Sequence, residues 1–157
     1  MKNWKMYVPD LLKRIYLSNL KDIDNPYIEE DHKNQCIFIH IPKNAGISIS
    51  EALFNSNIGH RKIKYFKIFD PDRFKEYFKF TFVRNPWDRF VSAYYFLKQG
   101  GRNPTDKKWG EENLSEFNSF EEFALSMEEP NFANKVLREQ HFSPQYKWFC
   151  GCNDEIE

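Results

Sequence analysis

Little cysteine, no excess of charge and no long apolar run are the first features of this 157-residue chain. Its three cysteines, Cys36, Cys150 and Cys152, are too few for a disulfide framework, and the spacing of the last two does not match a zinc knuckle. The 23 basic residues are balanced by 23 acidic ones, so nothing indicates nucleic acid or an anionic membrane as a partner. We therefore predict a protein with neither a metal site nor a nucleic-acid partner.

The distribution of apolar residues also bears on location. No segment approaches the roughly 20 consecutive apolar residues that span a membrane. Residues 1–20 carry four scattered basic side chains and lack the continuous apolar stretch of a secretory signal. We therefore predict no transmembrane segment and a cytoplasmic location.

What the chain does have is a high content of rings: 18% of its residues are aromatic, including 16 phenylalanines. A chain of this length is expected to form one domain with a substantial core, and aromatic side chains fill such a core efficiently. We expect residues 1–35 to form an N-terminal arm or helix, with one apolar face, and residues 36–157 to form the main domain.

Local signals predict strands that alternate with helices. The run from Cys36 to Ile41 is typical of a strand buried on both faces, and Asp70-Pro71 and Asn85-Pro86 each combine a capping residue with a proline at the first helical position. We expect strands at 36–41 and 80–83 and a polar loop at 100–118. Helices are expected at 47–54, from 71 onward, and at 86–97, 120–127 and 132–138. In the helix from 71 onward, Phe74 and Phe78 are expected on one face. This alternation predicts an α/β fold with a parallel central sheet.

The most informative stretch is Phe38-Ile-His-Ile-Pro-Lys-Asn-Ala-Gly-Ile-Ser48, which leads from a strand through a small-residue loop into a helix. The first N–H groups of a helix lack intrahelical partners and attract anions. Ala45 and Gly46 let a phosphate approach the backbone, Lys43 adds a mobile charge and Ser48 adds a hydroxyl. Because the lysine precedes the loop and a first glycine is missing, this is not the P-loop of nucleotide kinases. Alone, the motif is equally compatible with an ordinary turn and a solvated lysine.

A second motif surrounds Arg84, which ends a predicted strand, and Ser92, which lies about two turns along the following helix. In open α/β sheets, ligands bind at the carboxyl ends of the strands. The planar guanidinium of arginine suits a phosphate because it donates two parallel hydrogen bonds. Taken by itself, this motif is better explained by an Arg84–Asp88 pair and a packed serine.

Together the two motifs resemble those of sulfotransferases. Residues 38–48 look like the 5′-phosphosulfate loop of that family, and Phe82-Val-Arg-Asn-Pro-Trp-Asp-Arg-Phe-Val-Ser-Ala-Tyr-Tyr95 looks like its 3′-phosphate motif. The similarity is greatest to the Golgi-type carbohydrate sulfotransferases, including the 2-O-sulfotransferases, and their bacterial relatives. A trimmed Golgi-type protein is therefore an alternative to the cytoplasmic location. The resemblance implies a three-layer P-loop-like α/β fold with helices flanking a central parallel sheet. It also implies transfer of a sulfuryl group from 3′-phosphoadenosine 5′-phosphosulfate (PAPS) to a hydroxyl, without a metal.

The resemblance assigns a role to each motif residue. Lys43 would bind the 5′-phosphosulfate and stabilise the bridging oxygen as it leaves, and Arg84 and Ser92 would hold the 3′-phosphate. The backbone and hydroxyl donors around the 5′-phosphosulfate would come from Asn44, Ala45, Gly46, Ile47 and Ser48. The family often has Thr-Gly-Gly-Thr-Ser after the lysine, so Ile47 stands where a hydroxyl is expected.

In-line attack on sulfur needs a base for the acceptor hydroxyl, and histidine suits this near neutral pH. The Gly59-His60 pair resembles the position of the catalytic histidine in the 2-O-sulfotransferases, so His60 is the predicted base. His40 ends the first strand and is expected to line the site or to pack beside it. His141 begins His-Phe-Ser-Pro-Gln145, which resembles a His-x-x-Pro-Gln motif of carbohydrate sulfotransferases and is expected on the acceptor side or in the packing.

The acceptor is predicted to be a saccharide or another hydroxyl compound. Arg102 is the candidate for binding an anionic sugar, in a charged segment with further candidates at Lys98, Lys107, Lys108 and Trp109. A solvated charged loop with one packed tryptophan explains that segment equally well. Two alternative functions are not excluded by the sequence. One is a non-catalytic or truncated nucleotide-binding relative, because family domains are usually longer and a domain incomplete at its C-terminus would fit this length. The other is a P-loop-like kinase, for which no Walker pattern is present.

Overall fold

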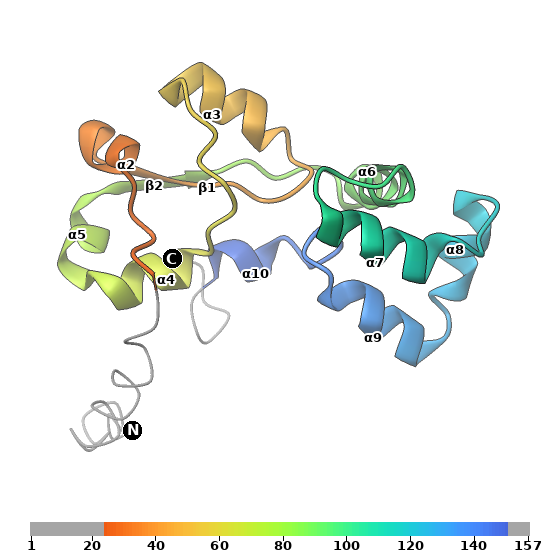
Figure 1. Ribbon diagram of the computed structural model, residues 1–157. Coiled ribbons are helices and arrows are strands. Elements are labelled where there is room, and N and C mark those ends of the chain that lie inside the picture. The colour runs from red at the N-terminus through yellow and green to blue at the C-terminus, as the bar shows by residue number, and fades with distance from the viewer. Residues whose placement is uncertain (1–23, 151–157) are drawn as a thin grey trace, which may run out of the picture.

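The computed structural model describes residues 24–150, which form a strand-containing half and an all-helical half (Figure 1). The apolar helical face expected within residues 1–20 lies outside the described residues. The elements in chain order are α2 (Glu29–Asn34), β1 (Cys36–Ile39), α3 (Gly46–Phe54), α4 (Ile63–Phe69), α5 (Pro71–Glu76), β2 (Phe78–Thr81), α6 (Pro86–Lys98), α7 (Pro104–Leu114), α8 (Phe120–Ser126), α9 (Pro130–Arg138) and α10 (Tyr146–Phe149).

The sheet of the described part consists of β1 and β2, paired in parallel from Cys36↔Phe78 to Ile39↔Thr81. The connection between them passes through α3 on one side of the strands and through α4 on the other (Figure 1). Parallel strands require such a crossover because a tight hairpin can join only antiparallel neighbours. The α/β class with parallel pairing is therefore confirmed.

β1 is buried on both faces, as its sequence predicts. Ile37 and Ile39 are at most 1% exposed and pack in a cluster with Phe66 of α4 and Trp148 of α10. Phe38 points to the opposite face, where its ring stacks on Phe80 of β2 with centroids 5.0 Å apart. Each such buried side chain stabilises the fold by about 1.5–3 kcal/mol, which fixes the strand from which the loop at Lys43 emerges.

A second apolar cluster holds the helical half together. It joins Tyr94 and Leu97 of α6 to Leu114 of α7, Phe123 of α8 and Val136 of α9, all at most 2% exposed. The caps expected at the start of two helices are present: Asp70 accepts a hydrogen bond from Arg73 N–H, and Asn85 accepts one from Trp87 N–H. The helices predicted at 86–97, 120–127 and 132–138 are confirmed as α6, α8 and α9.

Three sequence-based expectations are wrong. The segment 100–118 is not a loop, because α7 occupies Pro104–Leu114. Phe78 does not share a helix face with Phe74; α5 ends at Glu76, and Phe78 begins β2 with 69% of its surface exposed. Both strands also end two residues earlier than predicted, so Phe82 and Val83 lie beyond β2 and are exposed.

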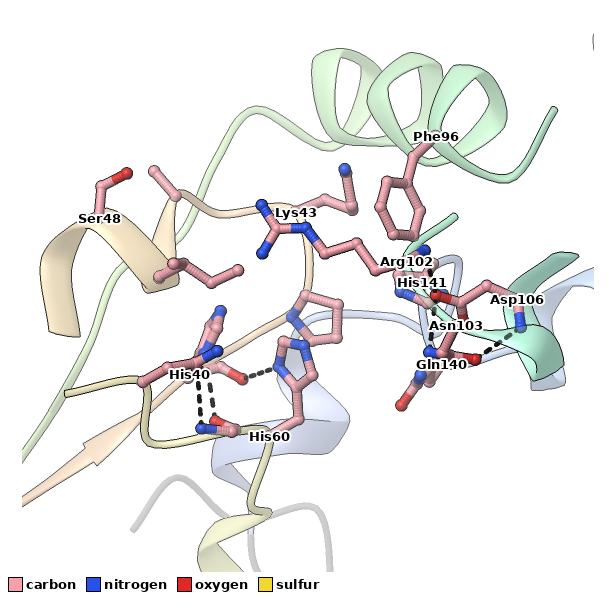
Figure 2. A pocket seen from close by; sticks show the side chains of 16 residues that line it. His40, Lys43, Ser48, His60, Phe96, Arg102, Asn103, Asp106, Gln140 and His141 are labelled. Atoms are coloured by element: carbon pink, nitrogen blue, oxygen red, sulfur yellow. Dashed lines mark hydrogen bonds between the residues drawn. The ribbon is translucent and has the colours of Figure 1, made fainter. Parts of the chain in front are cut away.

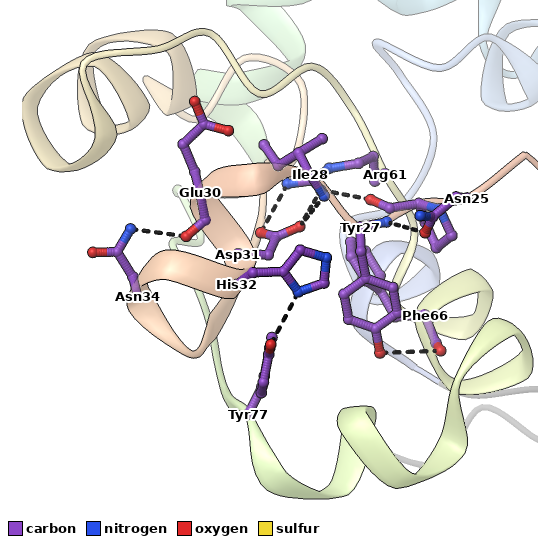
Figure 3. A network of polar contacts seen from close by, with 11 residues as sticks. Asn25, Tyr27, Ile28, Glu30, Asp31, His32, Asn34, Arg61, Phe66 and Tyr77 are labelled. Carbon is purple, nitrogen blue, oxygen red and sulfur yellow. Dashed lines mark hydrogen bonds and ion pairs between the residues drawn. The ribbon is translucent and has the colours of Figure 1, made fainter.

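The segment ahead of β1 is tied to the body of the protein by a buried ion pair (Figure 3). Asp31 of α2 is 2% exposed and accepts hydrogen bonds from Arg61, whose guanidinium also donates to the Pro26 carbonyl. Tyr27 donates to the Phe66 carbonyl of α4. These contacts hold the backbone immediately after His60.

Two negative findings concern the described residues. None of their helices combines the length and the apolar character needed to cross a membrane. Between residues 24 and 150, no three His, Cys, Asp or Glu side chains converge in a way that would hold a metal ion.

Candidate functional site

A cavity of about 400 Å³ lies where the two halves meet, at the end of β1 (Figure 2). Four loop segments line it, together with Phe96 of α6. The loops contribute His40 and Lys43 after β1, His60 before α4, Arg102 before α7, and His141 after α9. The five loop residues were selected from the sequence, and the fold brings them to one place.

The loop after β1 has the backbone of an anion site. Lys43 and Ala45 adopt left-handed conformations with φ of 68° and 58°, which turns the chain sharply into α3. A Cβ atom on Gly46 would lie 1.8 Å from Cδ2 of His40, so only glycine fits there. No side chain caps the start of α3, and its first N–H groups therefore stay available to an anion beside the cavity, which Ala45, Gly46, Ile47 and Ser48 all line.

Positive charge gathers around this loop, and among the residues that line the cavity Asp106 is the one that carries negative charge. The Nζ atom of Lys43 lies 3.8 Å from the centroid of the Phe96 ring. Burial lowers the pKa of Lys43, and Arg102 and Arg84 lower it further. Among the residues described, no ion pair joins any of these three cations to a carboxylate. The site is therefore built for an anion that is not part of this segment of chain.

The two sequence motifs are linked by one side chain. Gln145 accepts hydrogen bonds from Asn44 Nδ2 at 2.7 Å and from Arg84 N–H at 3.0 Å, and donates to the Arg84 carbonyl at 2.8 Å. Arg84 Nη1 also donates to the Lys43 carbonyl at 3.4 Å. The exposed Arg84 guanidinium thus lies at the rim of the anion loop, whereas Ser92, half-buried on α6, does not line the cavity.

Two histidines have their proton positions set by the backbone (Figure 2). Nδ1 of His60 lies 2.9 Å from the His40 carbonyl, and Nδ1 of His40 lies 3.1 Å from the Gly59 carbonyl. A carbonyl only accepts, so each Nδ1 carries the hydrogen and each Nε2 keeps its lone pair. Burial is the main cause that lowers both pKa values, to about 4 for His40. His60 is therefore neutral at pH 7, with a lone pair free to accept a proton.

His141 has a different partner. Its Nδ1 lies 3.0 Å from the Glu139 carboxylate, its ring packs on Phe96 with centroids 4.9 Å apart, and it is 4% exposed. Sequence reasoning selected His141 but missed Glu139, Phe96 and Asp106. An acidic residue two positions before a histidine is a weak signal, and only the structure shows that Glu139 contacts a histidine that lines the cavity.

The residues of the charged segment predicted to face the acceptor have different surroundings in the structure. Arg102 lines the cavity. Lys98 instead donates to the carbonyls of Leu114 and Phe117 near the end of α7, and Lys107 and Lys108 face solvent beside Glu111 and Glu112. Trp109 is half-buried, and its ring packs near Phe142. The solvated-surface interpretation thus holds for the two exposed lysines, and Arg102 is the member of this group that faces the site.

A comparison with protein families supplies an independent finding. A model described as the sulfotransferase family matches residues 27–157, which include every residue of the cavity. Searches of curated proteins and of solved structures returned no match.

Proposed function

The chain belongs to the sulfotransferase family, and we propose that it transfers a sulfuryl group from PAPS to a hydroxyl of a carbohydrate. The observation that carries the donor assignment is the pairing of the uncapped start of α3, beside Lys43, with the motif at Arg84 through Gln145. A nucleotide with phosphates at both its 5′ and 3′ positions matches two such anion sites, whereas ATP would need only one. We further propose that β1 and β2 belong to a three-layer, P-loop-like sheet.

The residues that line the cavity and those at its rim fit this donor. Lys43, Asn44 and the backbone from Ala45 to Ser48 would hold the 5′-phosphosulfate, and Arg84 would hold the 3′-phosphate. The uncapped helix start and the unpaired cations are the features that an anionic donor would satisfy. Ser92 keeps a proposed role at the 3′-phosphate only if the donor extends along α6 beyond the cavity.

His60 is the proposed general base. As the acceptor oxygen bonds to sulfur, the bond from sulfur to the bridging phosphate oxygen breaks, and the hydroxyl proton passes to Nε2 of His60. The leaving group is 3′-phosphoadenosine 5′-phosphate, whose new charge Lys43 stabilises. The hydrogen bond from His60 Nδ1–H to the His40 carbonyl orients the ring for this transfer.

A carbohydrate acceptor is supported by the opposite wall of the cavity. There Arg102, Asn103, Asp106, Gln140 and His141 present polar groups beside the ring of Phe96. Hydroxyl-rich ligands bind to walls of this kind because each hydroxyl both donates and accepts hydrogen bonds.

Donor binding is tested by calorimetry with 3′-phosphoadenosine 5′-phosphate. The wild-type protein binds it, and Lys43→Ala and Arg84→Ala abolish binding, whereas Lys107→Ala, at an exposed lysine beside Glu111, does not. Unchanged affinity for the nucleotide in both site variants would refute the donor assignment. Transfer from radiolabelled PAPS to a mixture of saccharides then separates an enzyme from a non-catalytic relative that only binds the nucleotide.

A further inference from the structure

Arg102 is placed differently from every other charged residue near the cavity. Its side chain extends from the turn before α7 across the cavity, and its guanidinium lies beside the Lys43 loop (Figure 2). In keeping with this placement, Arg102 lowers the pKa of Lys43 more than Arg84 does. Two cations from opposite walls therefore face the same small space.

The turn that carries Arg102 is held rigidly. Asp106 is 4% exposed and accepts hydrogen bonds from Arg102 N–H at 3.1 Å and from Asn103 Nδ2 at 2.9 Å. Gly101 has φ of +63°, and a Cβ atom there would lie 2.1 Å from Cβ of Asp106. The backbone of Arg102 is thus anchored by a buried carboxylate in a conformation that favours glycine at the preceding position.

The guanidinium itself is unused. Within residues 24–150 it makes no hydrogen bond and no ion pair, whereas its backbone N–H is satisfied. Lysines of the same region are employed elsewhere: Lys98 donates to carbonyls near the end of α7, and Lys107 lies beside Glu111. An exposed arginine on a fixed turn, aimed at an anion loop and left unpaired, has the properties of a ligand contact.

We propose that Arg102 is a catalytic residue that contacts the sulfuryl oxygens of the bound donor, an inference that rests on the proposed function. Lys43 neutralises the phosphate oxygen that leaves, while Arg102 faces the group that moves. Its planar fork donates two hydrogen bonds to two oxygens of one sulfuryl group, which the single ammonium of lysine cannot reproduce. Charge on these oxygens changes as the sulfur passes from donor to acceptor, so a donor fixed in advance stabilises the transition state.

The contact predicts a difference between two nucleotides that needs no knowledge of the acceptor. PAPS carries the sulfuryl group and 3′-phosphoadenosine 5′-phosphate lacks it. Calorimetric affinities for both are measured with the wild type, Arg102→Gln and the matched control Lys107→Gln, and chromatography verifies that PAPS stays intact during each titration. Arg102→Gln is expected to weaken PAPS binding about 10-fold to 100-fold, the range for a lost charge-assisted pair, and to change the affinity for the product less than about 2-fold. Lys107→Gln changes neither.

Three outcomes would overturn the assignment. Unchanged affinity for both nucleotides in Arg102→Gln means that the guanidinium serves the acceptor. An equal loss for both means that it holds the 5′-phosphate. Full PAPS affinity in Arg102→Lys means that the two-bond geometry of the guanidinium is not required. Failure of the wild type to bind either nucleotide is a separate result, because it refutes the proposed function itself.

Discussion

Replacing Gln145 by methionine tests whether the two phosphate motifs depend on each other. The substitution keeps the length of the side chain but removes three hydrogen bonds, one with Asn44 and two with the backbone of Arg84. At about 1 kcal/mol for each bond, the upper bound is about 3 kcal/mol. The bonds to the exposed Arg84 are partly replaced by water, and Asn44 keeps its bond to the Phe82 carbonyl at 2.8 Å. We therefore expect a loss of about 1–2 kcal/mol in the free energy of unfolding.

The functional effect should exceed the effect on folding. Without Gln145, the segment at Arg84 is no longer tied to the Lys43 loop through Asn44, so the two anion sites lose their fixed spacing. We expect about a 10-fold loss of affinity for 3′-phosphoadenosine 5′-phosphate, which corresponds to about 1.4 kcal/mol. Urea unfolding gives the free energy of unfolding, and calorimetry gives the affinity for the nucleotide. Gln99→Met, at the C-terminal end of α6, is the control. If Gln145→Met binds the nucleotide as tightly as the wild type does, Gln145 is no more than a packing residue.

Three further predictions concern pH and backbone strain. Because the pKa of His40 is lowered from 6.5 to about 4, the unfolded chain binds more protons than the folded one between these pH values, and the free energy of unfolding falls as the pH drops. From pH 7 to pH 5 the loss is about 2 kcal/mol. Urea unfolding at both pH values should show that His40→Gln removes this pH-dependent loss. Burial lowers the pKa of His60, so the acidic limb of the wild-type kcat/KM profile should lie below pH 6.5, and the residual activity of His60→Asn should show no such limb. An acidic limb above pH 6.5 in the wild type would exclude His60 as the base. Gly101→Ala should lower the free energy of unfolding by about 2–4 kcal/mol, through its steric overlap with Asp106, whereas Gly59→Ala, with a similar φ of +68° but no atom within 4 Å, should cost about 1 kcal/mol; thermal or urea melts that give equal losses would contradict this.

Local signals in the sequence predicted most helix starts, because a cap depends on only a few adjacent residues. Asp70-Pro71 and Asn85-Pro86 both act as expected. Asn103-Pro104 carries the same signal, and Asn103 does accept a hydrogen bond from Asp106 N–H, yet the polar composition of the segment favoured a loop. α7 also makes a tertiary contact: its Gly110 packs so close to α6 that a Cβ atom would lie 2.2 Å from the Leu97 carbonyl. Sequence reading on a single chain does not capture that contact.

The candidate site shows the same division. Lys43, Arg84 and His60 were found because each lies in or next to a motif whose residue types and spacing have a chemical reason. The bond between Asn44 and Gln145 joins residues 101 positions apart, and the pairing of His141 with Glu139 matters only because His141 comes to the cavity. Ser92 stays a prediction, since it lies two turns along the helix and outside the residues that line the cavity.

The electrostatics of the cavity link donor binding to the strength of the base. In the free protein, burial and His141 lower the pKa of His60, which keeps its lone pair available but makes it a weak proton acceptor. A bound anion beside Lys43 and Arg102 adds negative charge on the same side of the cavity, and an opposite charge near a histidine favours the protonated form. Donor binding should therefore strengthen His60 as a base when the sulfuryl group is present, and leave it weak when the site holds no donor. The acidic limb should accordingly lie at higher pH in kcat, which reports the bound complex, than in kcat/KM, which reports the free protein.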